Sequence, residues 1–202
     1  MNRFKIIVCA MLGVAALCGH ELSFGVDALS FFNSGNNYYN EGQYDKAIKE
    51  YDKALAINAD FTDVYYNRGF AYYKKGKYDE AIDDLGRALS HYPEDAELYQ
   101  ARGLAYFKKG RYENAIKDYS KVISIRPEYA DAYQNRGVAY SRSSRFDEAI
   151  DDFNKAISIR PDYSEAYFSR GFAYVKKAAA DFRKVCGMGN KNACENLKQL
   201  SE

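Results

Sequence analysis

The chain has no tryptophan, and only two histidines and three prolines among its 202 residues. His20 and His91 belong to no His/Cys/carboxylate set with metal-ligand spacing, so we expect no metal site and no cofactor. The sequence offers no strands, and therefore no glycine-rich phosphate loop that follows one. Adjacent carboxylates such as Asp83-Asp84 would point about 100° apart on a helix, which indicates solvated or ion-paired surface rather than an acid/base pair. These absences predict a protein without catalytic residues.

The chain also has no marked excess of positive or negative charge. Lysine and arginine number 29, and aspartate and glutamate number 28, so the formal net charge is +1. A protein that binds nucleic acid through bulk electrostatics would carry a strong basic excess. We therefore expect no nucleic-acid partner.

The first 25 residues differ from the rest and predict a signal peptide over residues 1–25. Arg3 and Lys5 precede an apolar run over residues 6–18, and small residues follow at 23–25. Thirteen apolar residues fall short of the roughly 20 that span a bilayer, so no membrane span is expected after cleavage. The alternatives are an uncleaved anchor and lipid attachment at Cys18. The prediction is an exported protein of the periplasm or cell envelope, or a secreted one.

Cysteine is scarce, and two of its four occurrences lie in the predicted signal peptide. Cys186 and Cys194 remain, an even pair in a compartment expected to be oxidising. On one continuous helix they would lie about 12 Å apart, which is too far for a disulfide. Gly187 and Gly189 predict a turn between them, so a disulfide becomes feasible. The alternative is two packed thiols.

What the chain does contain is a repeat of 34 residues. An Arg-Gly pair recurs with this period at 68–69, 102–103, 136–137 and 170–171. The three prolines follow the same period, and so do alanines at 47, 81, 115 and 149. Three unrelated residue types on one period indicate an array of structural units.

Each unit is predicted to form two helices. In residues 96–129, apolar residues recur at i, i+3 and i+4 on both sides of Gly110, which suits a helix C-terminus. Pro127 ends the second helix or opens the next turn. A helical hairpin of this size cannot bury both of its apolar stripes alone, so neighbouring units must stack.

These residues resemble the tetratricopeptide repeat (TPR) family. The preferred positions of that repeat are filled in the third unit by Tyr99, Arg102, Gly103, Tyr106, Ala115, Tyr119, Val122 and Pro127. The second and fourth units match as well, and the first more loosely. The resemblance implies an all-α solenoid, a right-handed superhelix, with four full repeats at 28–61, 62–95, 96–129 and 130–163. A shortened fifth repeat and a C-terminal capping helix would occupy residues 164–202.

The resemblance also implies a concave groove, lined by the first helix of each unit, that binds a protein or peptide partner. Acidic residues would lie on one rim and basic residues on the other. A carboxylate clamp for chaperone tails is not expected, because Glu97 and Ala101 stand where cations are needed. The predicted groove residues are Tyr66, Phe70, Tyr73, Lys74, Gln100, Leu104, Phe107, Lys108, Gln134, Val138, Arg142, Phe168 and Phe172.

One departure from the family pattern is systematic. Arginine replaces the usual apolar residue at 68, 102, 136 and 170, and aspartate recurs at 84, 118 and 152. We expect a ladder of ion pairs between adjacent units, in preference to a ligand-binding role.

The fifth unit lacks the five residues that would make its turn. Its sequence has Ala178-Ala179-Ala180 there, and alanine is the strongest helix former. The hypothesis is one uninterrupted helix over residues 164–185 that leaves an apolar face exposed. The predicted function is a protein-interaction scaffold in an envelope or secretion assembly. The alternative is a self-assembling protein that forms homo-oligomers through residues 164–202.

Overall fold

A computed structural model describes residues 15–200 of the chain, with side chains from residue 27 onward. The described residues form ten α-helices and no strand, which confirms the all-α repeat architecture. Of the predicted signal peptide, residues 1–14 lie outside the described residues, and 15–25 belong to the start of the first helix. No described helix is both long and apolar enough to cross a membrane.

The chain divides into two compact units at residues 64 and 65. The first contains α1 (Ala15–Asn40) and α2 (Tyr44–Ile57), which pack against each other. The helices approach closely at Gly35, where a Cβ would lie 2.5 Å from the ring of Tyr51. The Tyr51 hydroxyl donates a hydrogen bond to Asn36 Oδ1 at 2.8 Å. Gly35 and the buried ring of Tyr51 therefore fix the packing of this hairpin.

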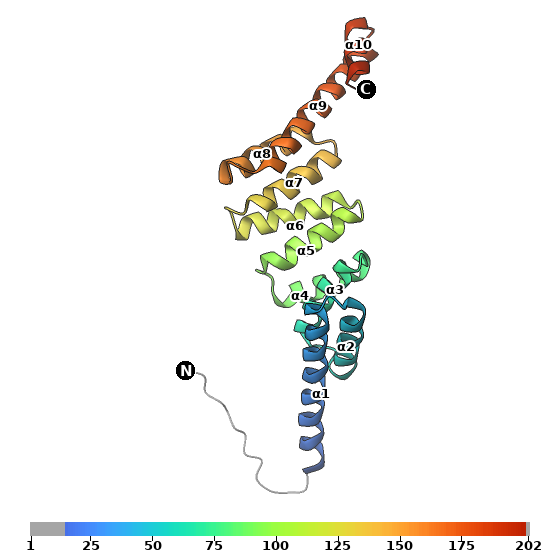
Figure 1. Cartoon of the computed structure of the whole chain (residues 1–202), viewed down its shortest axis with the longest axis vertical. Helices are drawn as coiled ribbons and strands as arrows, with labels where there is room; N and C mark the ends of the chain where they lie inside the picture. The colour runs from blue at the N-terminus through green and yellow to red at the C-terminus, as the bar shows by residue number, and fades with distance from the viewer. Residues whose placement is uncertain (1–14, 201–202) are drawn as a thin grey trace. The chain divides into compact units, whose positions relative to one another are not determined.

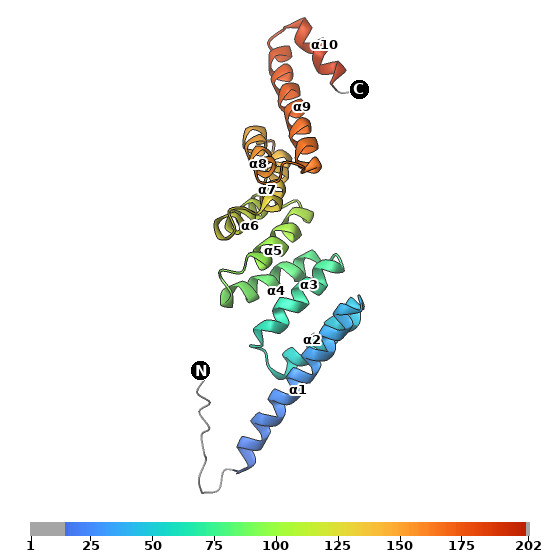
Figure 2. The ribbon, with the colours of Figure 1, turned by 60° about the vertical axis from the view of Figure 1, so that its left-hand side comes forward.

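The second unit continues the alternation of helices with short turns, and Figures 1 and 2 show its helices stacked in chain order. Each helix from α5 onward packs against the one before it. This order is what a solenoid of hairpins requires, because each repeat then contacts only its neighbours. The helices after α2 are α3 (Thr62–Lys74), which belongs to this unit from Tyr65 onward, α4 (Tyr78–His91), α5 (Ala96–Lys108), α6 (Tyr112–Ile125), α7 (Ala130–Arg142), α8 (Phe146–Ile159), α9 (Ser164–Gly187) and α10 (Lys191–Gln199).

The turn inside each complete hairpin depends on one residue with positive φ. Gly42, Gly76, Gly110 and Ser144 have φ values of 74°, 74°, 72° and 61°, a region that ends an α-helix and that glycine enters without steric cost. The next residue on the 34-residue period is Ala178, which lies inside α9. The chain therefore turns four times at this position of the repeat and continues as a helix at the fifth.

Small residues allow the two helices of each complete hairpin to approach. A Cβ on Gly103 would lie 2.8 Å from the ring of Tyr119, and one on Gly137 would lie 2.7 Å from the ring of Phe153. Both rings are buried. Their burial supplies much of the hydrophobic stabilisation of each repeat, at roughly 25 cal/mol for each Å² of apolar surface removed from water.

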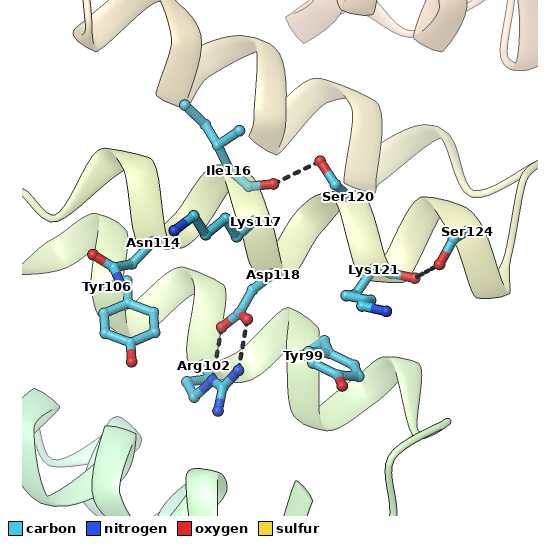
Figure 3. Close-up of a pocket in the computed structure, with 10 residues that line it drawn as sticks. All are labelled: Tyr99, Arg102, Tyr106, Asn114, Ile116, Lys117, Asp118, Ser120, Lys121 and Ser124. Atoms are coloured by element: carbon cyan, nitrogen blue, oxygen red, sulfur yellow. Dashed lines mark hydrogen bonds and ion pairs between the residues drawn. The ribbon is translucent and has the colours of Figure 1, made fainter.

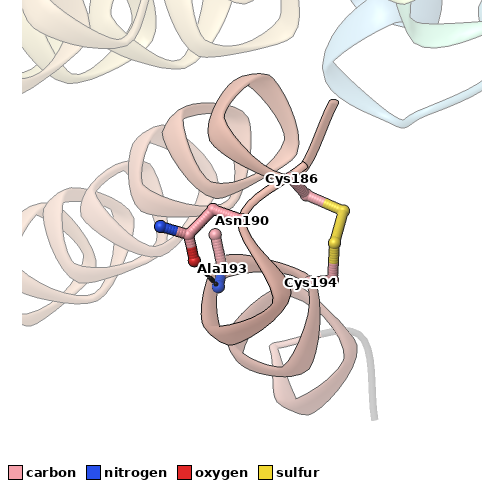
Figure 4. Close-up of a disulfide and its surroundings, with 4 residues drawn as sticks. All are labelled: Cys186, Asn190, Ala193 and Cys194. Carbon is pink, nitrogen blue, oxygen red and sulfur yellow. Dashed lines mark hydrogen bonds between the residues drawn. A yellow bond between two sulfur atoms is a disulfide. The ribbon is translucent and has the colours of Figure 1, made fainter. Parts of the chain in front are cut away.

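The hypothesis of an uninterrupted helix in the fifth unit is confirmed, because α9 runs without a break for 24 residues. Gly189, with φ of 92°, turns the chain after it. The side chain of Asn190 then accepts a hydrogen bond from Ala193 N and caps α10. Cys186 and Cys194 are joined by a disulfide, with their Cα atoms 4.8 Å apart (Figure 4). The turn and the disulfide attach α10 to the end of α9.

Candidate partner-binding surface

The predicted groove residues of the second unit differ in how much of each side chain solvent can reach. Five of them are exposed: Lys74, Lys108, Arg142, Phe168 and Phe172. Seven are half-buried and one is buried. The two phenylalanines of the fifth unit are the most open aromatic members, with exposed fractions of 78% and 50%.

The half-buried members also hold neighbouring helices together. Tyr66 and Phe70 stack at a ring-centroid distance of 5.1 Å and pack against the core between α4 and α5. Leu104 and Phe107 pack against the core of α6 and α7, and Val138 packs against that of α8 and α9. These residues therefore pack between repeats, and only part of each side chain remains open to solvent.

Gln134 is the buried member, with an exposed fraction of 8%. Its Nε2 donates to Ser169 Oγ at 2.8 Å and to the carbonyl oxygen of Glu165 at 3.5 Å, so it connects α7 to α9. Among the described residues, Gln134 Oε1 and Gln100 Oε1 are buried side-chain atoms without a hydrogen-bond partner. Gln134 therefore lies in the contact between two repeats, where a partner could reach little of its side chain.

Charged residues lie beside several of the predicted groove residues. Lys74, Lys108 and Arg142 are exposed, and the Lys176 ammonium lies 5.1 Å from the Phe172 ring centroid. The Tyr66 hydroxyl donates a hydrogen bond to Glu97 Oε2 at 3.5 Å. Burial, helped by the nearby carboxylates, raises the pKa of Tyr66 to about 12. Its hydroxyl is therefore a protonated hydrogen-bond donor at neutral pH.

A cavity of about 550 Å³ brings four of the predicted groove residues together between α7, the start of α8, and α9. They are Val138, Arg142, Phe168 and Phe172, and Lys176 adds a second cation. Its size is in the range of ligand sites, and it combines an apolar floor with a few polar groups. The sequence predicted these four residues through the family resemblance, but not that they share one cavity.

A second cavity, of about 700 Å³, lies on the surface of α5 and α6 and surrounds the ion pair of Arg102 and Asp118 (Figure 3). Its serine hydroxyls are already bonded, because Ser120 donates to the carbonyl of Ile116 and Ser124 to that of Lys121. It contains none of the predicted groove residues. The 550 Å³ cavity is therefore the better candidate for a partner.

The predicted ion pairs exist, but the expectation that they join adjacent units is wrong. Arg102 donates from Nε and Nη2 to both carboxylate oxygens of Asp118, at 2.8 and 2.7 Å, and both residues belong to one hairpin. Arg68 with Asp84 and Arg136 with Asp152 repeat this arrangement. The reason is geometric, since the antiparallel helices of a hairpin bring residues 16 apart face to face.

The environment of each pair stabilises the guanidinium charge. Arg102 lies 5.6 and 5.8 Å from the ring centroids of Tyr99 and Tyr106. Burial alone would lower the pKa of Arg102, but the hydrogen bonds and charge of Asp118 outweigh it, and the pKa is raised. The pair is a structural element of the hairpin, since a planar guanidinium fits a carboxylate bidentately and stacks on aromatic faces.

Two arginines of this series also bond to a polar residue of the preceding unit, a contact that was not predicted from the sequence. Arg136 Nη1 donates to Ser120 Oγ at 2.9 Å, and Arg170 Nη1 donates to Asn154 Oδ1 at 2.7 Å. Ser120 and Asn154 lie 34 residues apart, so a polar residue recurs on the period. This recurrence of a polar residue is the sequence feature that could have predicted the contact between units.

The described residues contain no group of three or more potential metal ligands. The class of protein that the helices define is an array of helical hairpins. The family models agree. A TPR repeat model matches residues 35–76 and 103–144, and a tetratricopeptide repeat model matches residues 62–95 and 130–163. Together they cover more than half of the chain, which belongs to the tetratricopeptide repeat family.

Solved structures resemble most of the chain. A crystal structure of MamA protein aligns with 28% identity and a TM-score of 0.73, over 87% of this chain and 91% of that chain. MamA residues 41-end from Desulfovibrio magneticus RS-1 align with 25% identity and a TM-score of 0.64, over 68% and 78% of the two chains.

A third structure is that of the second TPR domain of human RPAP3 in complex with the HSP70 peptide SGPTIEEVD. It aligns with 29% identity and a TM-score of 0.53, over 55% of this chain and 92% of that chain. A comparison with curated protein sequences finds no match.

Proposed function

We propose that this protein is a non-catalytic scaffold that binds a peptide or helix of another protein in its groove. The observation that carries the proposal is the 550 Å³ cavity, where Val138, Phe168 and Phe172 offer apolar surface beside Arg142 and Lys176. Exposed apolar surface with a charged rim is typical of interaction sites. The human RPAP3 domain, a relative of the same repeat family, holds a peptide in its solved complex.

The chemistry of the cavity specifies the partner segment. An apolar side chain would fill the space between Val138 and the two phenylalanines. A carboxylate beside it would pair with Arg142 or Lys176, because an arginine binds a carboxylate through two hydrogen bonds. The partner is therefore a protein segment with an apolar residue next to an acidic one.

Binding of a randomised peptide library to the purified protein tests this proposal. We expect the enriched peptides to combine an apolar and an acidic residue. The double variant Phe168→Ser/Phe172→Ser should lower their affinity for the protein by more than about tenfold, a loss of 1.4 kcal/mol in binding free energy. Tyr92→Ser is the matched control, since Tyr92 is an exposed aromatic residue at the C-terminus of α4, outside the groove. Equal affinity of the enriched peptides for the double variant and the control would refute the groove.

The proposed location is the bacterial envelope. It is supported by the basic and apolar residues at the start of the sequence and by the Cys186–Cys194 disulfide, which is typical of an oxidising compartment. Cell fractionation with mass measurement of the N-terminus tests it. A chain recovered from the cytoplasm with residues 1–25 intact would contradict export.

Self-association through residues 164–202 is a second candidate function. It is favoured by the exposed apolar side chains of α9, including Tyr167, Tyr174, Val175 and Val185, with exposed fractions of 37% to 52%. The two functions are compatible. Tyr167 and Tyr174 lie on a different side of α9 from Phe168 and Phe172 because of the 100° rotation for each helical residue.

A further inference from the structure

The first half of α9 has the residues of a hairpin's first helix but lacks the second helix that should cover them. Nothing lies within 4 Å of the position where Gly171 would carry a Cβ, whereas the equivalent Gly137 is closed by the ring of Phe153. Arg170 bonds to Asn154 but forms no ion pair within the described part of the chain. Tyr174 is 52% exposed. The uncovered surface of α9 therefore offers space above Gly171 and the positive charge of Arg170.

The second half of α9 has the residues of the missing helix. In complete hairpins that helix presents alanine, then aspartate three residues later and a large apolar residue immediately after, as in Ala115, Asp118 and Tyr119. Ala178, Asp181 and Phe182 repeat this spacing. The aspartate is the partner that an arginine such as Arg170 requires, and the ring is the group that covers a glycine such as Gly171.

These two halves cannot meet within one chain. Because α9 is continuous, Arg170 and Asp181 are separated by about 16 Å of helical rise. They nevertheless lie on one face, since residues 3, 4, 7, 8 and 11 apart fall on the same side of an α-helix. Along that face are Tyr167, Arg170, Gly171, Tyr174, Ala178, Asp181, Phe182 and Val185.

We propose that two copies of this chain exchange the second halves of α9. In the antiparallel pair, Arg170 of each copy binds Asp181 of the other, and Phe182 of each copy covers Gly171 of the other. The geometry is that of the complete hairpins, where Arg102 pairs with Asp118 and Gly103 lies under Tyr119. One two-fold axis then completes both fifth repeats at once.

The occupant is a second copy because the complementary residues are both in this sequence and lie too far apart along one continuous helix to meet within a chain. Charge complementarity sets the register, with Arg170 and Asp181 at the two ends of the proposed face on each α9. The missing five-residue turn is the cause, since a hinge too short to fold back favours exchange of an element between copies. The disulfide keeps α10 attached to α9, so α10 moves with the exchanged half as its cap.

The interface is distinct from the groove and does not depend on groove binding. If the peptide-binding experiment failed, the proposed exchange between copies would still stand. If the exchange failed, the proposed groove would still stand.

Charge reversal and its complementation test the proposal on the purified full chain, with mass measured by light scattering after size exclusion. We expect the wild type to be a dimer, and Arg170→Asp and Asp181→Arg each to weaken dimerisation by more than about tenfold. In each variant alone, like charges would face each other across the axis.

An equimolar mixture of the two variants should restore the dimer, with one chain of each kind. One site then pairs the Asp introduced at 170 with the Arg introduced at 181, and the other retains the wild-type pair. The matched control is Arg183→Asp, the same exchange of charge on the opposite side of α9, which should remain a dimer. A mixture that remains monomeric, or a wild type that is monomeric at high micromolar concentration, would overturn the proposal.

Restoring the missing turn gives an independent readout. Insertion of Gly-Lys-Tyr-Asp-Glu, the sequence of residues 76–80, between Lys177 and Ala178 would let the second half fold back onto Arg170 of its own chain. We expect a folded monomer with unchanged helical content. A folded insertion variant that is dimeric to the same extent as the wild type would contradict the exchange.

Discussion

The third and fifth repeats have nearly the same first helix in different surroundings. Gly103 is buried under the ring of Tyr119, while no atom lies within 4 Å of a Cβ at Gly171. Arg102 forms a bidentate ion pair with Asp118, while Arg170 bonds only to a neutral amide and stacks on Tyr167. The comparison shows that the burial of a first helix depends on the helix that follows it, and hence on a turn of five residues.

The largest expected effect concerns the ion pair that only the complete repeats contain. Arg102→Leu leaves the carboxylate of Asp118 buried without a cation, which should cost about 3–5 kcal/mol in the free energy of unfolding. The double variant Arg102→Leu/Asp118→Leu should recover most of this loss. The equivalent Arg170→Leu, measured at a concentration where the chain is monomeric, should cost less than about 1 kcal/mol.

Chemical denaturation monitored by circular dichroism measures all three values. Equal losses for Arg102→Leu and Arg170→Leu would show that the intramolecular pair adds nothing to the stability of a complete repeat.

An intermediate effect concerns the covalent bond at the end of the array. The complete repeats are held by packing, whereas α10 packs against α9 alone and is tied to it by the disulfide. Reduction should destabilise α10 by about 2–3 kcal/mol, as expected for a closed loop of this length. Amide hydrogen exchange should accelerate in α10 and remain unchanged in α5–α8. Equal acceleration throughout would mean that the end of the chain is coupled to the whole array.

The smallest effect concerns the two glycines. Gly103→Ala should destabilise the protein by about 1–2 kcal/mol, because its Cβ would lie 2.8 Å from the ring of Tyr119 and overpacking outweighs the gain in helix propensity. Gly171→Ala should instead stabilise the monomer by about 0.5–1 kcal/mol. The same substitution should weaken the exchanged dimer, where Phe182 of the second copy needs the space. Thermal melting and light scattering report the two quantities, and a stronger dimer in Gly171→Ala would argue against the exchange.

Much of the fold could be predicted from the sequence because its signals are local and repeated. The turn glycines, the stripes of apolar residues and the run of alanines at 178–180 act within a few residues of chain, so each predicts helix or turn where it stands. The continuity of α9 followed from these signals alone. The candidate site was less accessible, because Gln134 and Phe168 occupy similar positions on their helices but differ in exposure from 8% to 78%.

By itself, the sequence determined the period, the hairpins and the missing turn, since helix propensity and left-handed turn residues act through the local backbone. The tertiary structure decided that the arginines pair within a hairpin rather than between units, and that four groove residues share one cavity. It also decided which helix faces remain exposed to solvent. These outcomes depend on contacts between residues 16 to 35 positions apart, such as Arg136 with Asp152 and Gln134 with Ser169. Only the packing of neighbouring helices brings such residues together, and only the absence of that packing leaves the face of α9 uncovered.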